Sequence, residues 1–294
     1  MKKRTKSYLE YIAFRLAKAI LRLCPYVVIR SFLIGVFRAG MWLGIRTHVA
    51  RENLKMVFPD HSKQQINSII KEVYRNMAIT AAESFFCKKE KLYEQVRLEG
   101  WENLQEAQAL GRGVLMASAH MGNWELAGPY IATHYPLGVI YKPLRNRFLD
   151  AYLNRDRIRH NILLIEKKTA LRGILKALAE HYIVTIMVDQ NARRDGIVID
   201  FLGYPASTFT GVAKIAIKTG APIIIAIAVR QDQGKHRFHF EKLIDPQDFS
   251  PDESGVRELT SLVTRRIEKY ILAYPGQWFW VHRRWAGVEK ARRG

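Results

Sequence analysis

The stretch Gly113-Val-Leu-Met-Ala-Ser-Ala-His120-Met-Gly-Asn-Trp-Glu125-Leu-Ala-Gly128 decides the fold. Residues 114–119 are small or apolar, and the run is too short for a buried helix, so it predicts an interior strand. A turn follows, with Asn123 as the expected N-cap of a helix that begins at Trp124. Open α/β sheets place their sites where the carboxyl end of a strand meets a helix N-terminus. We therefore expect a functional site at His120.

His120 and Glu125 bring an imidazole and a carboxylate to the two sides of this turn. We expect His120 to be a general base that Glu125 holds and polarises; the alternative is a structural histidine. A second pair with the same spacing, His236 and Glu241, lies in an alternating segment, where residues five apart point to opposite faces of a strand. Ser118 lies inside the strand and is not presented as a nucleophile. A base without a nucleophile is typical of enzymes that activate the substrate's own hydroxyl.

Composition restricts the partners that the protein can have. The chain has 294 residues with 47 Lys and Arg against 27 Asp and Glu, a net charge of +20, which indicates an acidic partner. Nucleic acid, an anionic bilayer and an acidic protein all satisfy this condition. The absence of zinc-finger spacing and of an RNA-binding aromatic signature makes nucleic acid the weakest of the three. Cys24 and Cys87 have neither metal-site nor disulfide spacing, so we expect no metal site.

The N-terminal segment is basic and amphipathic. In residues 1–22 the apolar residues recur at helical spacing and the basic residues gather on the opposite face. Arg30 and Arg38 divide the following apolar runs, so none reaches the roughly 18 to 20 residues that span a bilayer. We expect residues 1–48 to be helices lying on a membrane surface. The alternative is a helix packed on the protein's own core with a solvated basic face.

Residues 49–294 alternate between strand and helix patterns, which predicts a single α/β domain with a mostly parallel sheet wrapped by helices. A capping-box pattern at Ser62 begins the first helix, and residues 92–98 are expected to be a connection. The expected strands are 114–119, 139–141, 162–165, 183–188, 198–201, 223–229 and 236–240, and the expected helices are 63–89, 147–159, 169–181, 211–219 and 252–274.

Polar residues follow several of these strands, as His120 does. Lys142 and Asn146 come after residues 139–141, and Asp189 and Gln190 come after residues 183–188. Arg157 and Arg159 precede the next strand and are candidate phosphate ligands. We expect these side chains to gather at one sheet edge as a substrate-binding set; solvated charges and turn caps are the alternatives.

Two further segments have two interpretations each. Residues 201–211 form a turn-rich loop whose hydroxyl groups and following helix favour either anion binding or simple capping. Residues 275–285 mix aromatic and cationic side chains, which is typical of a lipid headgroup boundary or of a packed tail.

Over nearly its whole length the chain resembles the late acyltransferases of lipid A biosynthesis, the lauroyl/myristoyl transferase family, within the lysophospholipid acyltransferase-like fold group. The His-x4-Glu pair is common to that whole group, and the later segments make the resemblance specific. Lys142 is a departure, because the family typically has Arg there. The segments are Arg51-Glu-Asn-Leu, His120-x4-Glu125, Tyr141-Lys-Pro-Leu-Arg-Asn146, Arg157-Ile-Arg159, Asp189-Gln190, Phe201-Leu-Gly, Pro205 to Gly211 and Gln277-Trp-Phe-Trp-Val-His-Arg-Arg.

This resemblance implies transfer of a fatty acyl chain from an acyl carrier protein thioester, or from acyl-CoA, to a hydroxyl of a lipid A precursor. His120 would take the hydroxyl proton and Glu125 would orient it. The resemblance places the surrounding substrate contacts at Lys142, Asn146, Arg159, Asp189 and Gln190. It implies no metal and no cofactor, and a peripheral location at the cytoplasmic face of the bacterial inner membrane.

Two alternatives stay open. The first is the same chemistry on another lipid acceptor, such as a lysophospholipid, an aminolipid or a phosphoinositol mannoside. The second is a non-enzymatic basic protein that binds membranes or nucleic acid, which explains the charge but leaves the polar strand ends unexplained.

Overall fold

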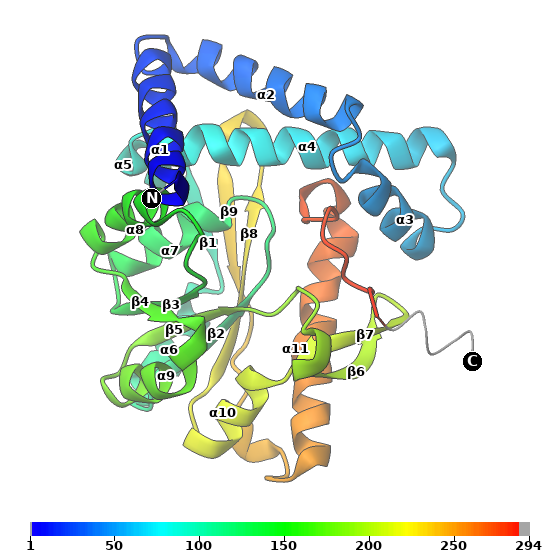
Figure 1. Ribbon diagram of the computed structural model, residues 1–294. Coiled ribbons are helices and arrows are strands. Elements are labelled where there is room, and N and C mark those ends of the chain that lie inside the picture. The colour runs from blue at the N-terminus through cyan, green and yellow to red at the C-terminus, as the bar shows by residue number, and fades with distance from the viewer. Residues whose placement is uncertain (1, 288–294) are drawn as a thin grey trace.

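The computed structural model describes residues 2–287 and has a seven-stranded sheet at its centre (Figure 1). The strand order is β1-β9-β8-β2-β5-β3-β4, and all neighbours are parallel except the antiparallel pair β8–β9. A separate hairpin pairs β6 (Gly196–Phe201) with β7 (Tyr204–Phe209). The sheet strands are β1 (Val96–Glu99), β2 (Val114–Ser118), β3 (Leu137–Tyr141), β4 (Leu163–Glu166), β5 (Ile183–Met187), β8 (Ile223–Arg230) and β9 (His236–Phe240).

Helices cover both faces of the sheet, as expected for α/β alternation. One buried cluster joins the sheet to α9, α10, α11 and residues 275–285, here called the C-terminal segment. The other cluster joins the sheet to α6 and α7. The helices are α1 (Lys2–Leu21), α2 (Tyr26–Trp42), α3 (Thr47–Val57), α4 (Lys63–Phe86), α5 (Lys89–Tyr93), α6 (Trp101–Ala109), α7 (Trp124–Ala132), α8 (Arg147–Arg159), α9 (Ala170–Ala179), α10 (Gly211–Thr219) and α11 (Glu253–Ala273).

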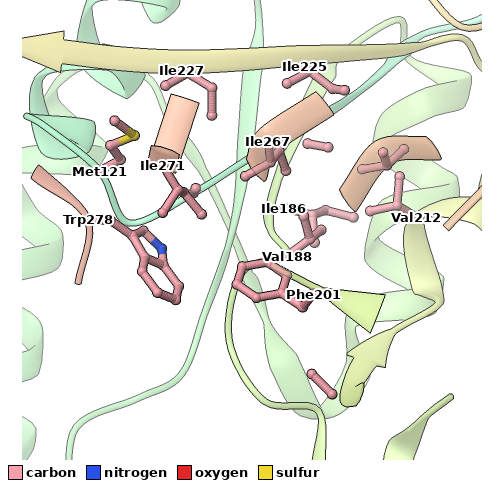
Figure 2. Close-up of a cluster of buried hydrophobic side chains, with 14 of the residues drawn as sticks. Met121, Ile186, Val188, Phe201, Val212, Ile225, Ile227, Ile267, Ile271 and Trp278 are labelled. Atoms are coloured by element: carbon pink, nitrogen blue, oxygen red, sulfur yellow. The ribbon is translucent and has the colours of Figure 1, made fainter. Parts of the chain in front are cut away.

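The first cluster anchors the C-terminal segment in the core (Figure 2). Alternate residues of the strands, such as Ile225 and Ile227 of β8, point to this face, because successive side chains of a strand point to opposite faces. Ile267 and Ile271 of α11, one helical turn apart, pack against them. Trp278 lies in the same cluster and is only 1% exposed, so the segment around it is built into the fold rather than lying on its surface.

Most of the predicted elements are confirmed. β2, β5, β8 and β9 occupy the predicted strands, α8 spans the predicted residues 147–159, and α10 spans 211–219. Ser62 and Gln65 form the predicted capping box at the start of α4. The predicted α/β fold with a mostly parallel sheet is therefore confirmed.

Three predictions about individual segments were wrong. Residues 198–201 belong to the hairpin and not to the main sheet, and residues 204–209, expected to be a loop, form β7. Residues 92–98, expected to be a connection, include the edge strand β1. β1 has four residues and alternates between half-buried and exposed side chains, so its local pattern is too short to indicate a strand.

The N-terminal helices α1 and α2 are present and carry exposed apolar side chains. Figure 1 shows α2 along the upper edge of the molecule, above α4. Leu23, before α2, is 86% exposed, and Trp42 and Leu43 at its end are 79% and 81% exposed. Among residues 2–287 no single helix is long and apolar enough to cross a bilayer; α2 and α3 meet that criterion only as a pair bent by 79°. The boundary at residue 48 and the membrane contact stay predictions.

Candidate active site

His120 faces Asp189 across two neighbouring strands. Ser118, the last residue of β2, pairs with Met187, the last residue of β5. His120 and Asp189 each lie two residues beyond these partners, so the parallel register brings them together. The Nδ1 atom of His120 lies 2.8 Å from Oδ1 of Asp189, and the His120 backbone N–H donates to Oδ2 over 2.9 Å.

This arrangement determines which nitrogen of the His120 imidazole carries the hydrogen. Asp189 is 2% exposed. Its burial opposes ionisation, but contact with His120 and an N–H bond from Trp278 hold the pKa of Asp189 below its ordinary value. A carboxylate can only accept, so Nδ1 of His120 carries the hydrogen and Nε2 is the nitrogen that can take a proton from a substrate.

The pKa of His120 is raised above its ordinary value. Burial disfavours the charged ring, but the charge of Asp189 and its hydrogen bond outweigh burial, and Glu125 contributes a smaller attraction. The His120 side chain is still 25% exposed, so a substrate can reach it. The pair can therefore accept a proton and stabilise the resulting imidazolium.

Glu125 does not hold the His120 ring, so the prediction that it orients the imidazole was wrong. Glu125 lies in the first turn of α7, and both of its carboxylate oxygens accept from the Arg157 guanidinium of α8 at 3.2 Å. The reason is the register of the sheet, which turns Nδ1 of His120 toward the end of β5 rather than toward α7. Glu125 acts on the ring only through its charge.

The turn between His120 and α7 is clamped by α4. The carbonyl oxygen of Gly122 accepts hydrogen bonds from Asn76 at 3.2 Å and from Thr80 at 3.0 Å. The Asn123 side chain caps α7 as predicted, and it also donates to the buried Glu83 carboxylate at 2.6 Å. Glu83 is paired with Arg230 at the end of β8. The backbone beside the imidazole is therefore held from outside the local sequence.

A pocket of about 1460 Å³ opens beside His120. Its inner wall is the sheet face that points toward α7, with apolar residues from five strands, and α1 and α8 form part of its sides. The apolar wall includes Met116, Val139, Met187, Ala226, Ala228, Phe238 and Phe240. The cations that line the pocket are Arg15, Lys18, Arg22, Lys88, Lys89, Lys142, Arg155, Arg157 and Arg159.

The structure brings some of the predicted substrate-binding residues to this pocket. Lys142 and Arg159 line it and are exposed. The Gln190 amide lies 3.4 Å from Nδ1 of His120, beside the pair with Asp189. Substrate contacts by these three residues stay predictions.

Asn146 and Asp189 make contacts within the protein, and substrate contacts by these two residues stay predictions. Asn146 caps α8, and its amide donates to the Ser7 carbonyl and to Glu10 of α1. The side-chain oxygen of Asn146 accepts from the first N–H groups of α8, and its NH2 group donates to α1. Both polar atoms of the side chain therefore have partners within the protein. Asp189 is buried behind the imidazole and orients it, as described above.

The structure also distinguishes between the two interpretations of residues 201–211 and of residues 275–285. Ser207 and Thr208 are buried, and the Arg284 side chain binds the Ser207 carbonyl and the Thr208 hydroxyl, so this segment is structural. The C-terminal segment is a packed one, with Trp278, Trp280 and Trp285 all at most 3% exposed.

The sequence did not predict the roles of four residues in the site. The sequence predicts Arg157 only as a candidate phosphate ligand, and no local pattern predicts its pairing with Glu125. Asn76 and Thr80 lie in a helix whose pattern shows only its apolar face. Trp278 donates its indole N–H to Asp189 over 2.8 Å, and the aromatic density of residues 278–285 was the one signal that pointed to its burial. Among residues 2–287 no group of three or more His, Cys, Asp or Glu side chains is arranged to hold a metal ion.

Comparisons with known proteins show what the chain is similar to. The chain is 28% identical over 252 residues to the lipid A biosynthesis palmitoleoyltransferase of Escherichia coli K12, covering 84% of this chain and 80% of the relative. It is 24% identical to the lipid A biosynthesis lauroyltransferase of the same organism, covering 88% and 86%. It is 26% identical to a phosphatidylinositol mannoside acyltransferase of Mycobacterium tuberculosis, covering 66% and 61%.

Two further matches complete the comparison. The solved 1-acyl-sn-glycerophosphate acyltransferase of Thermotoga maritima aligns with a TM-score of 0.41 and 18% identity, covering 85% of this chain and 98% of that one. The profile of a family described as bacterial lipid A biosynthesis acyltransferase matches residues 2–286. The chain belongs to this family and is an acyltransferase that acts on a lipid acceptor.

Proposed function

We propose that the protein transfers a fatty acyl chain from an acyl carrier protein thioester to a hydroxyl of a lipid A precursor, at the cytoplasmic face of the bacterial inner membrane. The observation that carries this proposal is the His120–Asp189 pair at the side of a large apolar pocket lined by cations. Acyl-CoA is the alternative donor.

His120 acts as the general base. Its Nε2 takes the proton of the acceptor hydroxyl while the hydroxyl oxygen attacks the thioester carbonyl carbon. The tetrahedral intermediate then collapses, the carbon–sulfur bond breaks, and the imidazolium returns the proton to the leaving thiolate. Asp189 stabilises the imidazolium in both steps. General base catalysis of this kind contributes about 10²- to 10⁴-fold in rate.

The apolar wall of the pocket suits the acyl chain. Burial of each methylene group contributes about 0.8 kcal/mol, so a pocket with this lining favours a fatty acyl chain over water. Its cations suit the phosphates of the acceptor and the acidic surface of a carrier protein. The same cations would attract the phosphates of acyl-CoA, so this charge pattern favours an anionic donor of either kind.

The N-terminal helices support a membrane location. Exposed apolar residues on α1 and α2 lie on the same part of the chain as many of its cations. An interfacial helix binds an anionic bilayer through both features, and each nearby cation contributes about 1 kcal/mol. The lipid acceptor would then enter the pocket from the membrane surface, beside α1.

The first test is His120→Ala in the purified full-length chain, with acyl carrier protein thioester and a disaccharide phosphate acceptor. We expect a loss of at least about 100-fold in kcat, because no other group supplies the base. Thermal unfolding of the variant serves as the control for folding. Turnover close to that of the unsubstituted enzyme would show that His120 is not the base.

The acceptor is tested separately. Mass spectrometry of lipid A from cells that lack the protein should show the loss of one secondary acyl chain, and overexpression should restore it. Unchanged lipid A, together with a change in phosphoinositol mannosides or phospholipids, would assign the chain to another acceptor. The phosphatidylinositol mannoside acyltransferases among the relatives make this the second candidate.

A further inference from the structure

Three consecutive residues of the C-terminal segment contact three different parts of the active site. The Gln277 carbonyl accepts from the Gly122 backbone N–H at 3.1 Å, in the turn between β2 and α7, here called the catalytic turn. Trp278 donates its indole N–H to Asp189, and the ring of Phe279 lies 6.3 Å from that of His120. A segment more than 150 residues away in the chain therefore forms one side of the site.

Trp278 is held by contacts on several sides. Its ring is packed between Phe201, Trp280 and Trp285, with ring centroids 4.7–6.4 Å apart, and Figure 2 shows it in the core cluster with Met121 and Ile271. Its backbone forms an isolated bridge with Met121, the residue after His120. The indole N–H is therefore held at a fixed place relative to the catalytic turn.

The two oxygens of Asp189 have different partners. Oδ1 holds Nδ1 of His120, whereas Oδ2 accepts from the His120 backbone N–H and from the Trp278 indole. A carboxylate with only one of these bonds can rotate about its Cβ–Cγ bond. Two donors on Oδ2 fix that rotation and leave Oδ1 directed at the imidazole.

On the basis of the function proposed above, we propose that Trp278 is a positioning residue for the reaction, whose indole N–H fixes the Asp189 carboxylate so that Asp189 in turn holds His120. Trp278 acts through Asp189 and does not itself touch the reacting atoms. The Trp278 N–H also partly offsets the negative charge of Asp189. It therefore limits how strongly the Asp189 carboxylate stabilises the protonated form of His120.

The other charged groups around this pair come from α7, α8 and the C-terminal segment. Glu125 of α7 faces His120, and its charge is shared with Arg157 of α8. His282 and Arg284 of the C-terminal segment interact electrostatically with Asp189. A substitution at Trp278 that keeps an aromatic ring leaves all four groups in place, so a change in the pH profile reports the lost N–H bond.

The test uses Trp278→Phe in the full-length chain, with Trp280→Phe as the matched control. Trp280 is equally buried, and its indole donates over 2.7 Å to the Pro275 carbonyl instead of to Asp189. A second variant, Trp278→benzothienylalanine, keeps the size of the two-ring side chain but has no N–H, and it serves if Trp278→Phe does not fold.

We expect kcat of both Trp278 variants to fall about tenfold, the effect of one hydrogen bond to a charged group. We also expect the acid limb of the kcat/KM profile to move to higher pH, because the unshared charge on Asp189 favours the imidazolium more strongly. Trp280→Phe should leave the acid limb unchanged. In an Asp189→Asn background, Trp278→Phe should have little further effect on kcat.

Two results would contradict the inference. The first is an acid limb in both Trp278 variants that coincides with that of Trp280→Phe. The second is a full tenfold loss that persists in the Asp189→Asn background, which would mean that Trp278 acts only on packing. Either result, in an enzyme that His120→Ala inactivates, overturns the role of Trp278 and leaves the proposed function intact.

Discussion

At the scale of single residues, the site depends on which carboxylate holds the imidazole. Glu125 is the acid nearest to His120 in the sequence motif, yet its oxygens are occupied by Arg157, while Asp189 binds Nδ1 from the neighbouring strand. The two acids therefore have separate roles. Asp189 orients the ring, and Glu125 adds negative charge near it and anchors α8 to α7 through Arg157.

Asp189→Asn distinguishes these roles. Removal of the carboxylate leaves burial as the dominant effect on the ring, so the pKa of His120 should fall and the acid limb of kcat/KM should move to lower pH. In the unsubstituted enzyme this limb should lie above pH 6.5, the ordinary pKa of histidine. We expect kcat to fall about 100-fold or more, because the imidazolium loses its partner.

Glu125→Gln is the comparison for this experiment. It keeps the bond between Nδ1 and Asp189 and removes only the smaller attraction, so its acid limb should move less than that of Asp189→Asn. A larger displacement with Glu125→Gln would restore Glu125 as the partner of His120 in the working enzyme. Both profiles are measured with saturating donor.

At the scale of elements, the conformation of the turn between β2 and α7 depends both on its own residues and on packing against β8 and α4. Gly122 has a φ of +55°, and a Cβ atom at this position would lie 2.2 Å from the carbonyl oxygen of Ala228. Glycine is therefore required twice, for the left-handed backbone and for the close approach of β8. Asn76 and Thr80 of α4 then fix the carbonyl of the same residue.

Gly122→Ala should destabilise the fold more than Gly203→Ala. Gly203 also has a positive φ, +79°, but has nothing within 4 Å of an added Cβ, so alanine there costs only about 1–2 kcal/mol of backbone strain. At Gly122 the clash with the Ala228 backbone is added to that strain. Thermal unfolding in detergent measures both, and equal Tm values would show that the turn moves away from β8 without cost.

At the scale of the whole molecule, charge and exposed apolar surface lie together at the N-terminal end. Along α2 the exposed Val28, Phe32 and Val36 recur every four residues and so form one stripe of the helix. Leu23 and Trp42 extend this surface at its two ends. The face of α2 toward α4 carries the buried Ile29 instead. This distribution suits a helix lying in a bilayer interface above the body of the enzyme.

Flotation with lipid vesicles tests this surface. The full-length chain should bind anionic vesicles more strongly than zwitterionic ones, and added salt should weaken the difference. Replacing Leu23, Trp42 and Leu43 together by Ser should reduce binding to anionic vesicles at least tenfold, since each loses about 1.5–3 kcal/mol of apolar burial. Leu171 and Leu272, exposed on α9 and α11, are the control positions. Equal binding of both variants would place the membrane contact elsewhere.

The sequence alone determined the features that depend on residues close together in the chain. The strand at residues 114–118, the Asn123 cap, the α7 start and the place of His120 all follow from local spacing, and each is confirmed. The α/β class follows because the periods of strand and helix alternate along the chain. Recognition of the acyltransferase family came from short motifs read in order.

Only the tertiary structure decided which groups meet. Asp189 is 69 residues from His120, and the parallel register of β2 and β5 makes them neighbours. Trp278 reaches Asp189 because the C-terminal segment packs into the core beside α11. The sequence placed both His120 and Asp189 at the ends of strands. It did not indicate that these two side chains pair or that Trp278 reaches them, since the pairing of strands is set by the whole hydrophobic core. The sequence motif therefore indicated Glu125 as the partner of His120, whereas in the folded protein the imidazole is hydrogen-bonded to Asp189.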